Sequence, residues 1–170
     1  GDAAALQERL EGSPAILSMF NAGIFVTGVD GVAIASVPAA ARRAGTNYMD
    51  RDFIAAAIRE ARSSIGKPVF GKHMQSPVLV IAAPIRDARG NVIGALAGVT
   101  DLAQANFLDK ITQSHYGKSG GYLLIAPQHN LFVTATDKSR IMQSLPAPGI
   151  NLMHDHYMQG YEGFGVGTNS

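Results

Sequence analysis

The sequence of 170 residues contains neither cysteine nor tryptophan. Without cysteine, the chain can form no disulfide, no thiolate zinc site and no cysteine nucleophile. The absence does not identify the cellular compartment, because exported chains can also lack disulfides. The length allows one domain, or one domain and part of another, with a sizeable buried core.

Charge is also scarce. Charged residues make up 16% of the chain, whereas about 25% is typical of a soluble domain. The 14 Lys and Arg residues nearly balance the 13 Asp and Glu residues. Nucleic-acid-binding proteins carry a basic surplus, so no nucleic-acid partner is expected. A hydrophobic fraction of 46% also excludes a disordered chain.

Long apolar runs are missing as well. The longest, at residues 78–85 and 92–99, are far shorter than the about 18–20 residues that a membrane-spanning helix needs. The first residues lack the basic region and apolar core of a signal peptide. If the domain is exported, we expect its targeting segment to have been removed.

The apolar periodicity and the turn residues predict three β-hairpins with intervening helices. The strands are expected at residues 23–29 and 32–37, 78–85 and 92–100, and 122–126 and 131–135. Asp30-Gly31 in the first hairpin is a strong two-residue turn signal. Helices are expected at residues 3–11, 52–64 and 102–112, with Asp101 as the N-cap of the last. A hairpin, a helix and a second hairpin in this order imply an antiparallel sheet and an α+β fold.

The second hairpin is expected at the centre of the sheet, because its nearly continuous apolar runs suit strands covered on both faces. Gly94 and Gly98 are spaced for close approach of a neighbour on one face of its second strand.

No group of residues resembles a catalytic or metal centre. The sequence has no nucleophile elbow, no zinc-binding His-Glu-x-x-His and no calcium loop. Gly117-Lys118-Ser119 lacks the upstream glycine of a phosphate loop. His154 and His156 would share a face on a strand, but two ligands are too few for a metal site, and an exposed polar loop is the simpler interpretation. We therefore expect no enzymatic activity, no metal and no cofactor.

One cluster suits the binding of a small molecule. Its candidate residues lie on three segments that an antiparallel sheet can bring together: Tyr48, Arg51 and Phe53, then Phe70, Lys72 and His73, and finally Asp101. A cationic group between aromatic walls, with one carboxylate nearby, suits an anionic or zwitterionic ligand. The alternative is that the charged residues pair or cap helices and the aromatic residues belong to the core.

These segments resemble the double-Cache, PAS-like extracytoplasmic sensor domains of bacterial signalling proteins. The resemblance extends over most of residues 20–137 and rests on Tyr48-Met-Asp-Arg-Asp-Phe53, Gly66-Lys-Pro-Val-Phe-Gly71 and the hairpin of residues 76–102. Residues 117–125 resemble the opening of the second, membrane-proximal module of such domains.

The resemblance implies a PAS-like, five-stranded antiparallel sheet with an N-terminal helix and flanking helices, followed by part of a second similar module. It divides the chain into the end of an N-terminal helix and a connection (1–22), a membrane-distal ligand-binding module (23–112) and an incomplete membrane-proximal module (113–170). It also implies a periplasmic location in a membrane-anchored, homodimeric receptor whose output is a histidine kinase, a diguanylate cyclase or a chemoreceptor.

For the site, the resemblance implies that Arg51 binds a ligand carboxylate and Asp101 an amino group. Three positions depart from the amino-acid-binding pattern: Ile54 replaces an aromatic residue, Thr46 a tyrosine and Gly71 a polar contact. These departures weaken the case for an amino acid and leave open a small carboxylate or a larger amphipathic molecule. The expected ligand class is an organic acid or an amino-acid-like molecule. The alternative function is a protein-interaction or dimerisation module without a small-molecule ligand.

Overall fold

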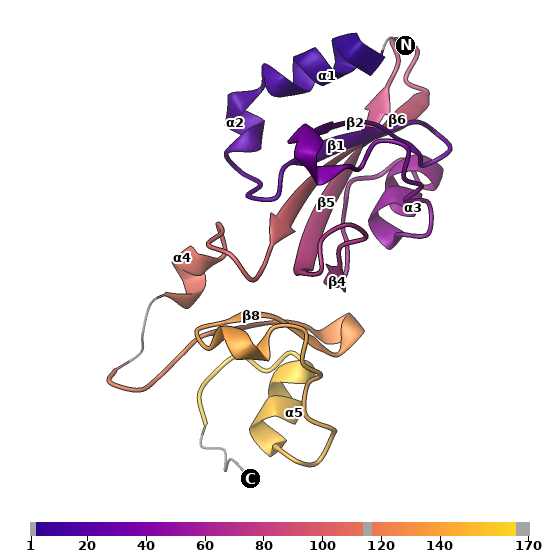
Figure 1. Cartoon of the computed structure of the whole chain (residues 1–170). Helices are drawn as coiled ribbons and strands as arrows, with labels where there is room; N and C mark the ends of the chain where they lie inside the picture. Colours follow the sequence, from indigo (N-terminus) through magenta and orange to yellow (C-terminus); the bar gives the residue numbers. More distant parts are fainter. Residues whose placement is uncertain (1–2, 114–116, 166–170) are drawn as a thin grey trace.

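The computed structural model describes residues 3–113 and 117–165 of the chain (Figure 1). Its larger part is built on an antiparallel sheet with the strand order β2-β1-β6-β5-β3, in which β4 also pairs with β5. The strands are β1 (Ile24–Thr27), β2 (Ala33–Val37), β3 (Ser64–Ile65), β4 (Val69–Phe70), β5 (Pro77–Arg86) and β6 (Val92–Asp101). The α+β class with an antiparallel sheet is confirmed.

The sheet has five strand positions, as expected, although it contains six strands. Strands β3 and β4 pair with successive stretches of β5, opposite Ala82 and Ile81 and then opposite Val78 and Pro77. They therefore share one edge of the sheet. The hairpin of β5 and β6 lies beside β1 and forms the centre.

Helix α3 (Asp52–Arg59) is shorter than the helix predicted at residues 52–64. The chain leaves it through Ala61, whose φ is 53°, a left-handed conformation that commonly ends helices. Ser64 and Ile65 can then pair with β5 as strand β3. The local amphipathic pattern could not predict this, because the pairing partner is remote in the sequence.

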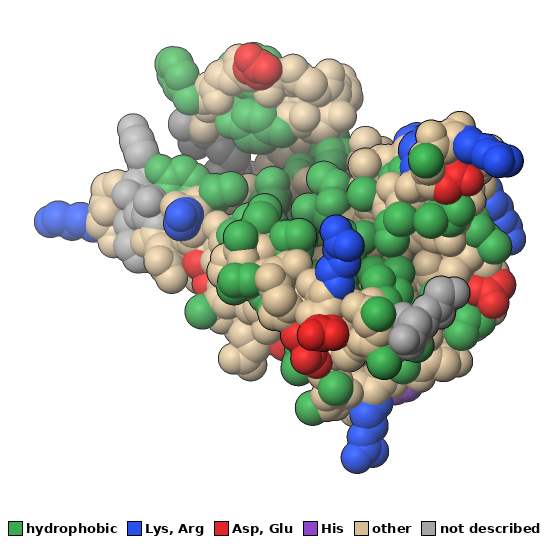
Figure 2. Space-filling view, turned by 90° about the horizontal axis from the view of Figure 1, so that it is seen from above, with side chains coloured by type: hydrophobic (Ala, Val, Ile, Leu, Met, Phe, Trp, Pro, Cys, Tyr) green, Lys and Arg blue, Asp and Glu red, His purple; other side chains and the backbone are tan. Residues whose placement is uncertain are grey.

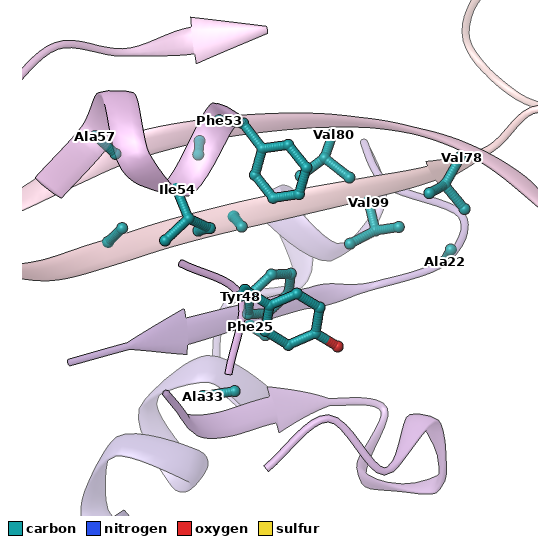
Figure 3. Close-up of a cluster of buried hydrophobic side chains, with 13 residues drawn as sticks. Ala22, Phe25, Ala33, Tyr48, Phe53, Ile54, Ala57, Val78, Val80 and Val99 are labelled. Carbon is teal, nitrogen blue, oxygen red and sulfur yellow. The ribbon is translucent and has the colours of Figure 1, made fainter. Parts of the chain in front are cut away.

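The two faces of the sheet carry separate cores. On one face, Phe53, Ile54 and Ala57 of α3 pack on the central strands (Figure 3). On the other face, α1 (Ala3–Glu11) packs through Leu10 against β1 and β2. The Gln7 side chain fixes α1 to β2, because its amide both donates to and accepts from the Ser36 backbone at 2.9 and 3.0 Å.

The close approach expected at Gly94 and Gly98 is confirmed. A side chain at position 94 would collide with the carbonyl oxygen of Thr27 in the neighbouring strand, and one at position 98 with the ring of Phe20. Phe20 follows the short helix α2 (Pro14–Leu17) and belongs to the core beneath α1.

The helix predicted at residues 102–112 is wrong, because only α4 (Asp109–Thr112) is helical. Asp101 belongs to β6 and does not cap a helix; its Oδ1 accepts a hydrogen bond from the backbone of Ala103 at 2.9 Å. The Asn106 side chain likewise accepts from the backbone of Leu108 at 3.0 Å. Such local side-chain bonds favour turns over a continuous helix.

A smaller unit follows α4, and it contains the third predicted hairpin. This hairpin consists of β7 (Leu123–Ala126) and β8 (Leu131–Ala135), with η2 (Pro127–His129) between them, and is followed by η3 (Lys138–Arg140) and α5 (Leu152–Met158). The boundaries predicted at residues 22 and 112 stay predictions. Residues 1–2, 114–116 and 166–170 of the predicted segments lie outside the described residues.

His154 and His156 lie on helix α5, neither on a strand nor in the exposed loop favoured by the sequence. Residues two apart on a helix point in very different directions, so these imidazoles do not share a face. Within residues 3–113 and 117–165, no group of three His, Cys, Asp or Glu side chains could hold a metal ion. No helix there has the length and apolar character to cross a membrane.

The face of the molecule seen from above reflects the low charge of the composition (Figure 2). Figure 2, which looks down on the molecule from the top of Figure 1, shows charged side chains scattered among apolar and uncharged groups.

Candidate ligand-binding site

A cavity lies on the α3 side of the sheet, beneath the segment that runs from β4 toward β5. It encloses about 390 Å³ of space between protein atoms, including its opening to solvent. Helix α3 borders the cavity through Phe53, and its residues Ile54 and Ala57 pack on the same face of the sheet.

The apolar wall comes mainly from the sheet and the start of α3. It contains Phe25 from β1, Val78 and Val80 from β5, Val99 from β6, and Tyr48 and Phe53. The rings of Phe25 and Tyr48 lie side by side, with centroids 4.6 Å apart and an interplanar angle of 34° (Figure 3). Burial raises the pKa of the Tyr48 hydroxyl, which therefore stays protonated at neutral pH and can donate a hydrogen bond.

Two cations near the cavity share one acidic neighbour. Lys72 Nζ lies 2.6 Å from the Asp50 carboxylate and also donates to the backbone carbonyl of Asn47 at 2.7 Å. Arg51 Nε lies 3.9 Å from the same carboxylate, and its Nη2 donates to the Phe70 carbonyl at 3.3 Å. The hydrogen bond from Lys72 lowers the pKa of Asp50, so this carboxylate is ionised at neutral pH.

Arg43 is a lining residue that the sequence analysis missed. It is only 4% exposed, and its Nη2 donates to the Ala22 carbonyl at 2.7 Å. Its Nη1 is buried without a hydrogen-bond partner. Burial lowers the pKa of the guanidinium, but an arginine side chain remains charged.

Nothing in the run Ala39-Ala-Ala-Arg-Arg43 distinguished the two arginines. Arg42 is exposed and Arg43 is buried. A positive φ of 51° at Arg42 ends the short helix η1 (Ala39–Ala41) and redirects the chain.

Six of the seven candidate residues line this cavity: Tyr48, Arg51, Phe53, Phe70, Lys72 and His73. His73 Nε2 is hydrogen-bonded to Thr46 Oγ1 at 2.7 Å, which connects the two loops that border the cavity. Gly71 also lines the cavity. At this departure from the amino-acid-binding pattern, the cavity wall therefore has no side chain that could contact a ligand.

Asp101 is not among the residues that line the cavity. It lies opposite Val78 in the register of β5 and β6, so it is adjacent to the apolar wall. Its Oδ1 accepts hydrogen bonds from the Ser76 hydroxyl and the Ala103 backbone. That Asp101 binds a ligand amino group stays a prediction.

The sheet order, the helix α1 on one face and the cavity on the other agree with the PAS-like arrangement that the sequence resemblance implied. No protein-family model matches the chain, and no curated protein matches it. Solved structures do, and the chain shares their fold. The resemblance to double-Cache sensor domains is confirmed at the level of the fold.

One similar structure is the ligand-binding domain of the Pseudomonas fluorescens chemoreceptor CtaA in complex with L-serine, with a TM-score of 0.64 and 20% identity over 84% of this chain. Another is the sensor domain of the Vibrio cholerae histidine kinase DctB, with a TM-score of 0.64 and 18% identity over 94% of this chain. A third is the ligand-binding domain of the Pseudomonas aeruginosa PAO1 amino acid chemoreceptor PctC in complex with GABA, with a TM-score of 0.66 and 18% identity over 87% of this chain. The chain spans 59%, 58% and 66% of these three chains, respectively.

Proposed function

We propose that this chain is the extracytoplasmic sensor domain of a membrane-anchored receptor and binds a small carboxylate-containing molecule in the cavity. The observation that carries the proposal is the charge of the cavity wall. Arg43, Arg51 and Lys72 line it, and no Asp or Glu is among the described residues that do. A site of this kind recognises an anion, and guanidinium groups bind carboxylates through two parallel hydrogen bonds.

The structural neighbours support a sensor role, since they include ligand-binding domains of chemoreceptors and the sensor domain of a histidine kinase. By analogy, the domain lies in the periplasm, acts without catalysing a reaction, and passes a signal to a kinase, diguanylate cyclase or chemoreceptor output as a homodimer. The modules at residues 23–112 and 113–170 are part of this proposal.

Signalling requires that the ligand bind one conformation better than another. The two loops bordering the cavity, at residues 46–53 and 70–75, are the parts that a ligand would draw toward the sheet. Lys72 and His73 already connect these loops through Asp50 and Thr46. A ligand at Arg51 and Lys72 would change these contacts, and the change would reach α1 through the sheet.

A melting-temperature screen of the purified chain tests the proposal. The panel contains amino acids, monocarboxylates and dicarboxylates, and at least one compound should raise the melting temperature in a dose-dependent way. Arg51→Ala should remove the shift. Asp101→Ala should also weaken it if Asp101 contributes to the ligand site.

Arg89→Ala is the matched control, because Arg89 is exposed in the turn between β5 and β6. It should retain the full shift. A panel without any hit, or a hit that persists in Arg51→Ala, would contradict the proposal. The first outcome would favour a protein-interaction module.

A further inference from the structure

Arg43 is a buried charge without a carboxylate partner. Among the described residues, its hydrogen-bonding neighbours are the Ala22 carbonyl and the sulfur of Met74, which are both uncharged. Its Nη1 is buried without a hydrogen-bond partner, and Arg43 is among the residues that line the cavity. A buried ion is costly unless it is paired, so this guanidinium is placed for an anion that enters the cavity.

The charge balance requires more than one negative group. Three cations line the cavity, and the exposed Asp50 contacts two of them, Lys72 and Arg51. Asp50 can neutralise one of these two cations. Arg43 and the remaining cation are then left without an acidic partner.

The cations occupy different positions along the aromatic wall. The guanidinium of Arg43 lies 5.8 Å from the ring centroid of Phe25, whereas Lys72 Nζ lies 5.3 Å from that of Tyr48. The two rings are in contact, and Val99 is part of the same wall. The buried Arg43 thus lies over one ring and the partly exposed Lys72 over the other, which defines an inner and an outer cationic position on this apolar wall.

We propose that Arg43 forms an inner anion-binding subsite and that the cavity selects a dicarboxylate with a short hydrocarbon chain. One carboxylate binds at Arg43, the hydrocarbon part lies on the Phe25 and Tyr48 rings, and the second carboxylate binds at Arg51 and Lys72. The inference rests on the proposed function and names the ligand class of the same site.

An amino acid is a poorer match for this wall. An ammonium group needs an acidic or carbonyl acceptor, and the described lining residues include no acidic side chain. One Asp101 oxygen already accepts from Ser76 and Ala103. Inorganic phosphate or sulfate would leave the apolar wall between the two cationic positions unused.

Isothermal titration of the purified chain tests the inference. The panel consists of α,ω-dicarboxylates from malonate to adipate, with butyrate, GABA, L-serine and inorganic phosphate for comparison. At least one dicarboxylate should bind more tightly than every comparison compound. Arg43→Met, which keeps the volume and removes the charge, should weaken that dicarboxylate by roughly 10–100-fold, the loss of a charge-assisted hydrogen bond, and should change butyrate binding by less than about 3-fold.

Arg42→Met is the matched control, since Arg42 is the exposed neighbour in the same segment, and it should bind like the wild type. Arg43→Lys should recover part of the lost affinity, because the charge returns without the planar fork. The circular dichroism of each variant verifies that it is folded.

The outcomes separate the two proposals. Preference for a monocarboxylate or an amino acid, or a dicarboxylate affinity that Arg43→Met does not reduce, overturns the inner subsite and leaves the sensor function standing. Tightest binding of phosphate also overturns the dicarboxylate inference. Absence of binding by every organic compound in the panel overturns both.

Discussion

At the scale of single residues, Arg43 is suited to binding a ligand but lowers the stability of the ligand-free fold. Its guanidinium is buried, its Nη1 is unpaired, and burial lowers its pKa. Replacing a buried charge by an apolar side chain of similar volume is often neutral or stabilising. Sites that bind ligands commonly carry such a cost in the absence of the ligand.

We therefore expect Arg43→Met to leave the free energy of unfolding of the ligand-free protein unchanged or to raise it by up to about 2 kcal/mol. Chemical denaturation at pH 7 measures this. The loss of the bond to the Ala22 carbonyl opposes the gain. A decrease of more than about 2 kcal/mol would mean that Arg43 mainly supports the fold.

The individual residues also show where sequence reasoning was sufficient. Tyr48, Arg51 and Phe53 lie close together in the chain, so their spacing and the family resemblance were enough to predict that they share one site. Arg43 could not be assigned in this way, since its burial depends on contacts with Ala22 and Met74, which are distant in the sequence.

At the scale of elements, helix α3 is held mainly by burial of its apolar face. Ile54 is fully buried, and Phe53 and Ala57 pack beside it on the sheet. Asp52 supports the start of the helix, because its carboxylate accepts from the backbone N–H groups of Phe53 and Lys67 at 2.8 and 3.1 Å. The second bond connects α3 to the turn between β3 and β4, which leads to the cavity.

Ile54→Ala should lower the free energy of unfolding by about 2–5 kcal/mol, because it removes buried methyl groups and leaves a cavity. Ile65→Ala is the control, with the same change at a side chain that is 66% exposed, and should cost less than about 1 kcal/mol. Urea denaturation of both variants measures the difference. Equal costs would contradict the assignment of Ile54 to the core.

At the scale of the whole molecule, a small core joins the sheet to the β7–β8 hairpin, and a partly buried ion pair joins α4 to η3. Leu79, Leu108 and Val133 belong to this core. Lys138 Nζ lies 2.6 Å from the Asp109 carboxylate, whose side chain is only 7% exposed. Burial alone would raise the pKa of Asp109, but Lys138 and the Asn106 backbone lower it below its usual value.

A lowered pKa means that Asp109 contributes stability above its unfolded-state value of about 3.9, and that this contribution is lost as the pH falls through the folded-state value. In Lys138→Met, burial is no longer opposed by the cation, so the pKa should rise and the ionised carboxylate should destabilise the fold at neutral pH.

We expect Lys138→Met to cost roughly 1–3 kcal/mol at pH 7, less than a fully buried pair, because Lys138 is 36% exposed. The difference from the wild type should shrink as the pH approaches 4, where Asp109 of the variant is protonated. Denaturation curves at pH 4 and 7 measure this, with the exposed Lys110→Met as control. A cost that is the same at both pH values would contradict the role of the ion pair.

The sequence by itself determined the class of fold, because hairpin turns and apolar runs are local signals. Asp30-Gly31 and the stretch from β5 to β6 specified the antiparallel sheet without reference to any distant residue. By contrast, the turns after Asp101 and the strand β3 were missed, since hydrogen bonds to specific neighbours overrode the helical pattern there.

Only the tertiary structure decided the composition of the cavity wall. It placed Arg43 inside and Arg42 outside, although the two residues are identical and adjacent. In the folded chain, an Asp101 oxygen also accepts hydrogen bonds from the Ser76 hydroxyl and the Ala103 backbone. The physical reason is that the strands and loops around a side chain set its burial and its hydrogen-bond partners. These elements are remote in the sequence, so the role of a charge in a cavity can be read only from the folded chain.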